Sequence, residues 1–210
     1  MARSWPRRVR VTTDAATAME QVDACVSLSA LAMSATHDDR ARDELLTRVR
    51  EMALRYCRVR LGRFGAEDTA QDVAQEVCMA VLTALPTYEE RGVPFEAFVY
   101  TVTSRRLADV QRSAMRGPTP IAEMPDQVDD GPTPEAAALV RDEAALALTL
   151  MRRLPDQQRE ILILRVAVGL STEETAAALG MTTGAIRVAQ HRALAKLRAM
   201  LAEMQAGDVA

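Results

Sequence analysis

The sequence predicts an all-α protein in which two small helical domains are joined by a flexible acidic linker. Aromatic residues make up only 3% of the 210-residue chain, and most apolar residues are aliphatic, which favours helices over sheets. Apolar residues recur at steps of three and four on both sides of a central stretch. That stretch, residues 117–134, contains GPTP twice and is rich in acidic residues, which is typical of an extended, poorly packed segment.

The pattern divides the chain into five segments. They are a flexible N-terminal extension (1–40), a first helical domain (41–113), the acidic linker (114–138), a second helical domain (139–204) and a tail (205–210). Within the extension, residues 26–35 faintly resemble a signal-peptide core, but Glu20 and Asp23 precede them where such peptides carry positive charge. No apolar run approaches the roughly 18 residues that span a bilayer. We therefore expect a soluble, cytoplasmic protein, with Met19 as an alternative start.

Three helices are predicted in the first domain. Apolar side chains share one face of the first helix, at Leu45, Val49, Met52, Tyr56 and Val59. A second helix runs from about Glu67 to just before Pro86. A third runs from about Phe95 to Arg112, after the turn-prone sequence ERGVP.

The second domain contains the pattern of a helix-turn-helix in residues 169–198. Ser171 and Glu174 have the spacing of a capping box, and Gly180 can adopt the left-handed conformation that ends a helix. Ala176 and Ile186 then stand where a small residue and an aliphatic anchor are needed to pack the two helices. The pattern favours DNA binding over a plain helical hairpin with a solvated basic face.

On the second helix of this motif, the inner stripe consists of Ile186, Ala189, Ala193, Leu197 and Met200. The opposite side combines small, basic and hydrogen-bonding residues, as a helix in the major groove requires. The candidate DNA-contacting residues are Thr182, Thr183, Gly184, Arg187, Val188, His191, Arg192 and Arg198.

Other functional classes find little support. The three cysteines, Cys25, Cys57 and Cys78, are widely spaced and lack histidines at ligand spacing, so we expect buried thiols and no metal site. Neither a glycine-rich phosphate loop nor a nucleophile–base set is evident, and we expect no enzyme activity and no cofactor. The net charge of −3 argues against a protein that simply coats nucleic acid.

The first domain indicates which kind of helix-turn-helix protein this is. Its segment Asp72-Val-Ala-Gln75-Glu76, followed by Phe95-Glu-Ala-Phe98-Val-Tyr100 and a basic helix end, resembles region 2 of the extracytoplasmic-function (ECF) sigma factors. The stretch LPDQQREILILR through RVAQHRALAKLR is similar to region 4 of that family. The resemblance covers roughly residues 42–113 and 140–201, and DVAQEVC, ILILRVAVGLS and RVAQHRAL resemble the sigma-D-like subgroup in particular.

The resemblance implies a sigma factor that binds core RNA polymerase, recognises −35 and −10 promoter elements and assists melting. It implies contacts with the β′ clamp helices and the β flap, control by an anti-sigma factor, and no membrane contact except through that factor. The polymerase-binding residues would be Asp68, Gln71, Asp72, Gln75 and Glu76, and the −10 contacts Arg105, Arg106 and Arg112. The sequence departs from the family pattern at two positions that concern the −10 contacts. Phe98 replaces the commoner tryptophan, and Arg105 stands where many relatives carry asparagine.

In the family, the acidic linker threads toward the positively charged active-site cleft of the polymerase, where its carboxylates would mimic phosphates. A stand-alone helix-turn-helix regulator is the alternative interpretation. It would bind specific DNA without polymerase and would leave the Asp72–Glu76 motif unexplained. Because the linker is acidic and proline-rich, we expect the two domains to have little reason to pack together.

Overall fold

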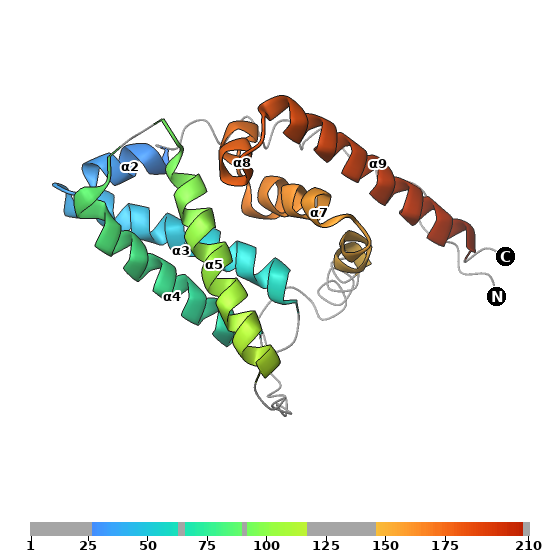
Figure 1. Ribbon diagram of the computed structural model, residues 1–210, viewed down its shortest axis with the longest axis horizontal. Coiled ribbons are helices and arrows are strands. Elements are labelled where there is room, and N and C mark those ends of the chain that lie inside the picture. Colours follow the sequence, from blue (N-terminus) through green and yellow to red (C-terminus); the bar gives the residue numbers. More distant parts are fainter. Residues whose placement is uncertain (1–26, 63–65, 90–91, 117–145, 208–210) are drawn as a thin grey trace, which may run out of the picture.

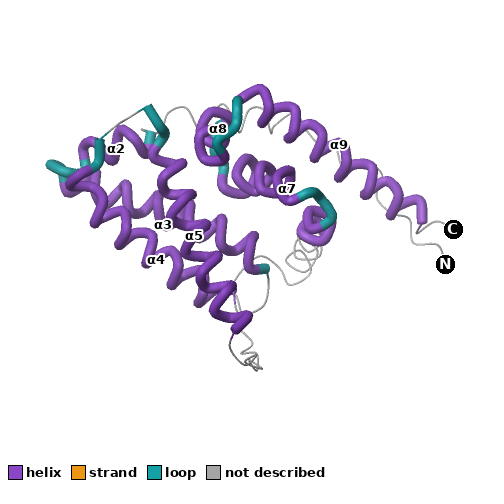
Figure 2. Tube along the Cα trace, viewed as in Figure 1, coloured by secondary structure: helices purple, strands orange, loops and turns teal. Residues whose placement is uncertain are grey.

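The computed structural model describes residues 27–62, 66–89, 92–116 and 146–207 (Figure 1). Within these ranges every regular element is a helix, which confirms the all-α prediction (Figure 2). None of these helices is long and apolar enough to cross a membrane. The linker was predicted for 114–138, but residues 114–116 belong to α5, and 117–138 lie outside the described residues. The elements are α2 (Leu28–Ser34), α3 (Asp39–Leu61), α4 (Ala66–Ala84), the 3₁₀ turn η2 (Leu85–Thr87), α5 (Phe95–Arg116), a helical stretch at 146–152, α7 (Asp156–Leu162), the π-helix η3 (Ile163–Val168), α8 (Thr172–Leu179) and α9 (Thr183–Gly207).

Helices α2–α5 form the first unit, in which α3 packs along α4 and α5 (Figure 1). The predicted apolar face of α3 is confirmed, because Leu45, Val49, Met52 and Tyr56 are all buried. Phe95 lies in the same core between Tyr88 and Phe98. Cys57 is also buried, and desolvation raises the pKa of its thiol to about 11, so that it stays protonated.

The expected flexible extension is wrong in its last third. Residues 28–34 form α2, whose first turn is capped by the hydroxyl of Ser27 accepting from the Ala30 N–H. Leu28, Leu31 and Ala32 are buried in the core of the first unit. Within the segment that resembles a signal-peptide core, the helix α2 packs against α3 and α5, which accounts for its apolar side chains.

The second unit, residues 146–207, has the predicted helix-turn-helix. The Ser171 hydroxyl accepts from the Glu174 N–H, and the Glu174 carboxylate accepts from the Ser171 N–H. Gly180 ends α8 with a φ of 63°, a conformation that side chains disfavour. The Thr182 hydroxyl then accepts from the Ala185 N–H and caps α9. The local signals in the sequence therefore set both helix ends.

The expectation that the two units have little reason to pack together is wrong. Helix α8 packs on α5, and η3 packs on α3 (Figure 1). Four apolar residues of the second unit belong to the same buried cluster as the core of the first: Ile163, Leu164, Val168 and Leu170. The composition of the linker does not predict whether the surfaces of the two units that it connects will pack together.

Candidate protein and nucleic-acid interfaces

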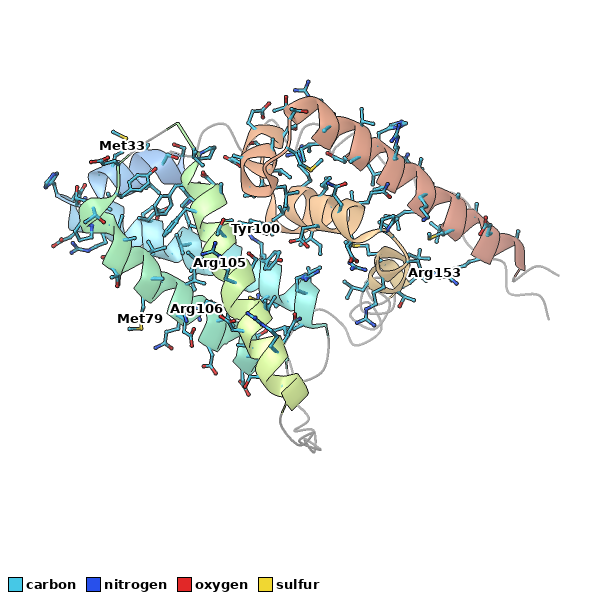
Figure 3. The ribbon with its side chains drawn as sticks, in the orientation of Figure 1. Met33, Met79, Tyr100, Arg105, Arg106 and Arg153 are labelled. Atoms are coloured by element: carbon cyan, nitrogen blue, oxygen red, sulfur yellow. The ribbon has the colours of Figure 1, made fainter. Side chains whose placement is uncertain are left out.

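Helix α4 presents an acidic, solvent-exposed face. Its inner stripe is buried at Val73, Val77 and Val81, and the opposite side of the helix faces outward. Asp68, Asp72, Gln75 and Glu76 are all exposed, and Met79 beside them is 61% exposed. Figure 3 shows Met79 pointing away from the bundle. A face of this kind can offer charge complementarity to a basic partner.

Two members of the predicted polymerase-binding set make contacts within the first unit. The Gln71 side chain is half-buried, donates to Glu67 at 2.9 Å and accepts from Arg50. Glu67 in turn pairs with Arg58 at 2.7 Å, which lowers the pKa of the Glu67 carboxyl. Gln71 therefore helps to join α3 to α4, and the outward-facing part of the predicted set is Asp68, Asp72, Gln75 and Glu76. Of these, Glu76 reaches Arg106 of α5.

The three predicted arginines of α5 do not all face the same way. Arg105 and Arg112 are seven residues apart and so share one face, and both are exposed. Arg112 pairs with Asp109 on the preceding turn. Arg106 lies on the side of α5 toward α4, 3.5 Å from Glu76 (Figure 3). Arg106 and Glu76 border an open hollow of about 480 Å³ with Met79, Ala80, Thr83 and Ala84.

Helix α9 has the predicted two-sided arrangement. Ile186 and Ala193 are fully buried, whereas Arg187, Val188 and His191 are exposed. Arg187 lies 3.8 Å from Glu173, an exposed and therefore weak pair. Of the remaining candidates, Thr183 is half-buried, Thr182 caps the helix, and Gly184, Arg192 and Arg198 are exposed. The start of α9 is thus available to a groove in DNA, with Gly184 allowing a close approach.

Sequence reasoning missed a polar cluster where the two units meet. The Glu160 carboxylate of α7 accepts from the Tyr56 hydroxyl at 2.7 Å and from the Tyr100 hydroxyl at 2.9 Å. Arg60 lies 3.4 Å from the other carboxylate oxygen. Burial, and next the negative charge of Glu160, raise the pKa of both tyrosines, which keeps their hydroxyls protonated as donors. No local pattern reveals this cluster, since the partners of Glu160 lie 60 to 104 residues away.

A second buried polar group lies near the same junction. Glu96 is only 6% exposed and accepts from the Leu28 N–H at 3.2 Å, at the start of α2. Desolvation raises the pKa of the Glu96 carboxyl, and the nearby carboxylate of Glu174 from α8 adds to this effect. Glu96 thus fixes α2 to α5. Among the described residues, no group of three His, Cys, Asp or Glu side chains could hold a metal ion.

Comparisons with known proteins match both units to one family. The family model for sigma-70 region 2 matches residues 43–117, and the model for sigma-70 region 4 matches residues 145–197. The ECF RNA polymerase sigma factor ShbA of Streptomyces griseus is 53% identical over 169 residues, which cover 78% of this chain and 88% of ShbA. The ECF RNA polymerase sigma factor SigD of Mycobacterium tuberculosis is 46% identical over 193 residues, covering 91% of this chain and 88% of SigD.

The fold is also similar to that of CnrH, solved in complex with the cytosolic domain of CnrY. The two chains superpose with a TM-score of 0.54 and 24% identity, over 84% of this chain and 96% of the solved one. This likeness supports the fold alone. The resemblance predicted from the motifs of α4, α5 and the helix-turn-helix is confirmed by the family models and the relatives, including the relative named SigD.

Proposed function

The chain belongs to the family of ECF RNA polymerase sigma factors and is a transcription initiation factor. From this we propose that its two units bind different partners. The first unit binds core polymerase and −10 DNA, and the second unit binds −35 DNA. One observation carries this division: the exposed acidic face lies on α4 of the first unit, whereas the exposed basic readout face lies on α9 of the second.

The polymerase-binding surface is the outward face of α4. Asp68, Asp72 and Glu76 would pair with arginines of the β′ clamp helices, and Gln75 would hydrogen-bond beside them. Gln71 would act indirectly, by joining α4 to α3. The second unit would contact the β flap.

The −10 element would be held by α5 and the segment before it. Melting requires a base to leave the stack and cations to hold the single strand, and Arg105 and Arg112 are exposed on one face for this purpose. Arg106 would contribute less, because it already pairs with Glu76 beside the polymerase-binding face. The protein itself carries out no catalysis and needs no cofactor in this scheme.

Partners other than polymerase and promoter DNA follow from the same family. We expect an anti-sigma factor that covers both units and keeps the protein from polymerase. We also expect the protein to act in the cytoplasm. The acidic residues Asp126, Asp129 and Asp130 would enter the positively charged cleft of the polymerase and mimic a phosphate backbone there.

Footprinting with and without core polymerase tests the proposal against the stand-alone regulator. Free protein should give no promoter-specific protection. Adding core polymerase should produce protection of both the −35 and −10 regions, with thymines near −10 reactive to a single-strand probe. Specific protection by the free protein, with no melting on addition of core, would instead establish the stand-alone regulator.

The −35 contact makes a second prediction, at Arg187. Replacing Arg187 with alanine should relax the preference at one or two upstream bases and cost about 1–3 kcal/mol if the guanidinium reads guanine with two hydrogen bonds. Arg198, farther along α9, is the matched control, since a phosphate contact weakens binding to all sequences alike. Transcription from a library of −35 variants measures both effects. The same ranking of sequences with Arg187→Ala as with wild type would exclude base readout by this residue.

A further inference from the structure

We propose that Ser29 of α2 is a positioning residue for promoter melting, because it holds the start of α5 and the turn before it in the shape that −10 recognition requires. The inference rests on the proposed −10 contacts of α5. It assigns a role to α2, which lies beside the start of α5 (Figure 1). In this scheme α2 acts through α5 and does not itself touch the DNA.

Each of the two helices satisfies a backbone N–H group at the start of the other. Such groups have no partner within their own helix. The N–H of Phe95, the first residue of α5, donates to the Ser29 hydroxyl at 3.0 Å. In the opposite direction, the N–H of Leu28, the first residue of α2, donates to the Glu96 carboxylate at 3.2 Å. Together the two hydrogen bonds fix both the position and the rotation of α2 on α5.

Apolar packing surrounds this pair of hydrogen bonds. On the side of α2, Leu31 is buried in the core of the first unit. On the side of α5, Phe95 is 1% exposed and contacts the rings of Tyr88 and Phe98, with centroids 4.9 and 5.4 Å away. Tyr88 precedes the turn and Phe95 follows it, so their contact holds the two ends of the turn together. The Ser29 hydroxyl thus binds the backbone at the residue where the turn ends.

The turn held in this way presents an apolar side chain to solvent. Val93 is 54% exposed, and Gly92 before it has a φ of 71°, a conformation that other residues disfavour. On α5, Arg105 is exposed ten residues past Phe95, about 15 Å along the helix (Figure 3). An apolar contact and a nearby cation are what an unstacked base and its phosphate need. Their relative placement depends on how the turn joins α5, and Ser29 fixes that junction.

A fixed junction matters because the capture of a base requires an ordered binding surface. If the turn became ordered only when the base arrived, the entropy cost of ordering would reduce the free energy available for melting. The bond from Phe95 to Ser29 supplies that order before DNA binds. We expect the loss of one such hydrogen bond to slow melting by up to about tenfold.

A purely structural role for α2 makes a different prediction, and Ser27 distinguishes the two roles. The Ser27 hydroxyl accepts from the Ala30 N–H and so caps α2 itself. Ser27→Ala and Ser29→Ala each remove one hydrogen bond at the start of α2, and both should lower the melting temperature by similar amounts. Only Ser29→Ala removes a bond to α5. Ser29→Thr keeps the hydroxyl and should behave as wild type.

The measurements use the full-length variants with core polymerase on duplex promoter DNA, at a temperature where circular dichroism shows each variant to be folded. The reactivity of the −10 thymines to a single-strand probe follows the rate of opening, and a library of −10 variants reports base preference. Ser29→Ala should slow opening by up to about tenfold and reduce the differences among −10 variants. Its core affinity and −35 protection should match wild type. Ser27→Ala and Ser29→Thr should match wild type in all four measurements.

Equal opening rates and −10 preferences for Ser29→Ala and wild type would overturn the proposal. Equal slowing by Ser27→Ala and Ser29→Ala would also overturn it, because α2 would then only stabilise the first unit. A loss of core affinity or −35 protection as large as the loss in opening rate would do the same. Failure of the wild-type protein to open the promoter with core would contradict the proposed function, and with it this inference. That failure is recognisable because it occurs without any substitution at Ser29.

Discussion

Replacing Asp72 and Gln75 together with alanine should weaken association with core polymerase about thirtyfold. Both side chains are exposed on the outward face of α4, next to the exposed Met79. Losing charge-assisted hydrogen bonds at such an interface costs on the order of 2 kcal/mol or more, which corresponds to that factor. Neither residue packs in the core, so the melting temperature of the free protein should stay the same.

The choice of positions follows from the contacts. Glu76 is left unchanged because its pairing with Arg106 would mix a polymerase effect with a −10 effect. Gln71 is left unchanged because it joins α4 to α3. Asp43→Ala/Glu44→Ala, which removes two exposed carboxylates from α3, is the control for a general loss of negative charge. Titration of labelled core enzyme measures each affinity, and an unchanged affinity of the α4 variant would remove this face from the proposal.

The parts of the fold that sequence reasoning predicted are those governed by local signals. The capping box of Ser171 and Glu174 and the left-handed Gly180 act within one helical turn. The buried stripe of α4 and the inner side of α9 follow from a helical period that spans several turns. Such signals depend only on residues that are close together in the chain, so the order of the amino acids is enough to recognise them.

The features that were missed depend on contacts between distant segments. Helix α2 is only seven residues long, too short for its period to stand out, and it is held by Glu96, which is 68 residues away from its partner Leu28. The π-helical turn at Ile163–Val168 could not be predicted, since an apolar run carries no mark of a wider turn. The docking of the two units rests on Glu160 and its tyrosine partners, which share no local pattern.

One side of α9 is buried and the other is exposed. Substitutions at neighbouring positions should therefore affect stability and DNA recognition separately. Ile186 is fully buried against Ile161 and Ala176, where it anchors the two helices of the motif to α7. Ile186→Ala should destabilise the second unit by about 2–5 kcal/mol, through lost burial and the cavity left behind. Val188, two residues on, is 51% exposed on the readout face. Val188→Ala should leave stability within about 0.5 kcal/mol of wild type.

The functional consequences should divide in the same way. Ile186→Ala should abolish −35-dependent transcription at temperatures where the second unit has melted, and should restore part of it on cooling, because the readout side chains themselves are intact. Val188→Ala should reduce −35 discrimination equally at all temperatures, because it changes the exposed surface of α9 and does not affect the stability of the fold. Thermal melts followed by circular dichroism, paired with transcription at two temperatures, measure both effects. A stable Ile186→Ala protein beside a destabilised Val188→Ala protein would mean that the buried and DNA-facing sides of α9 are the reverse of those described.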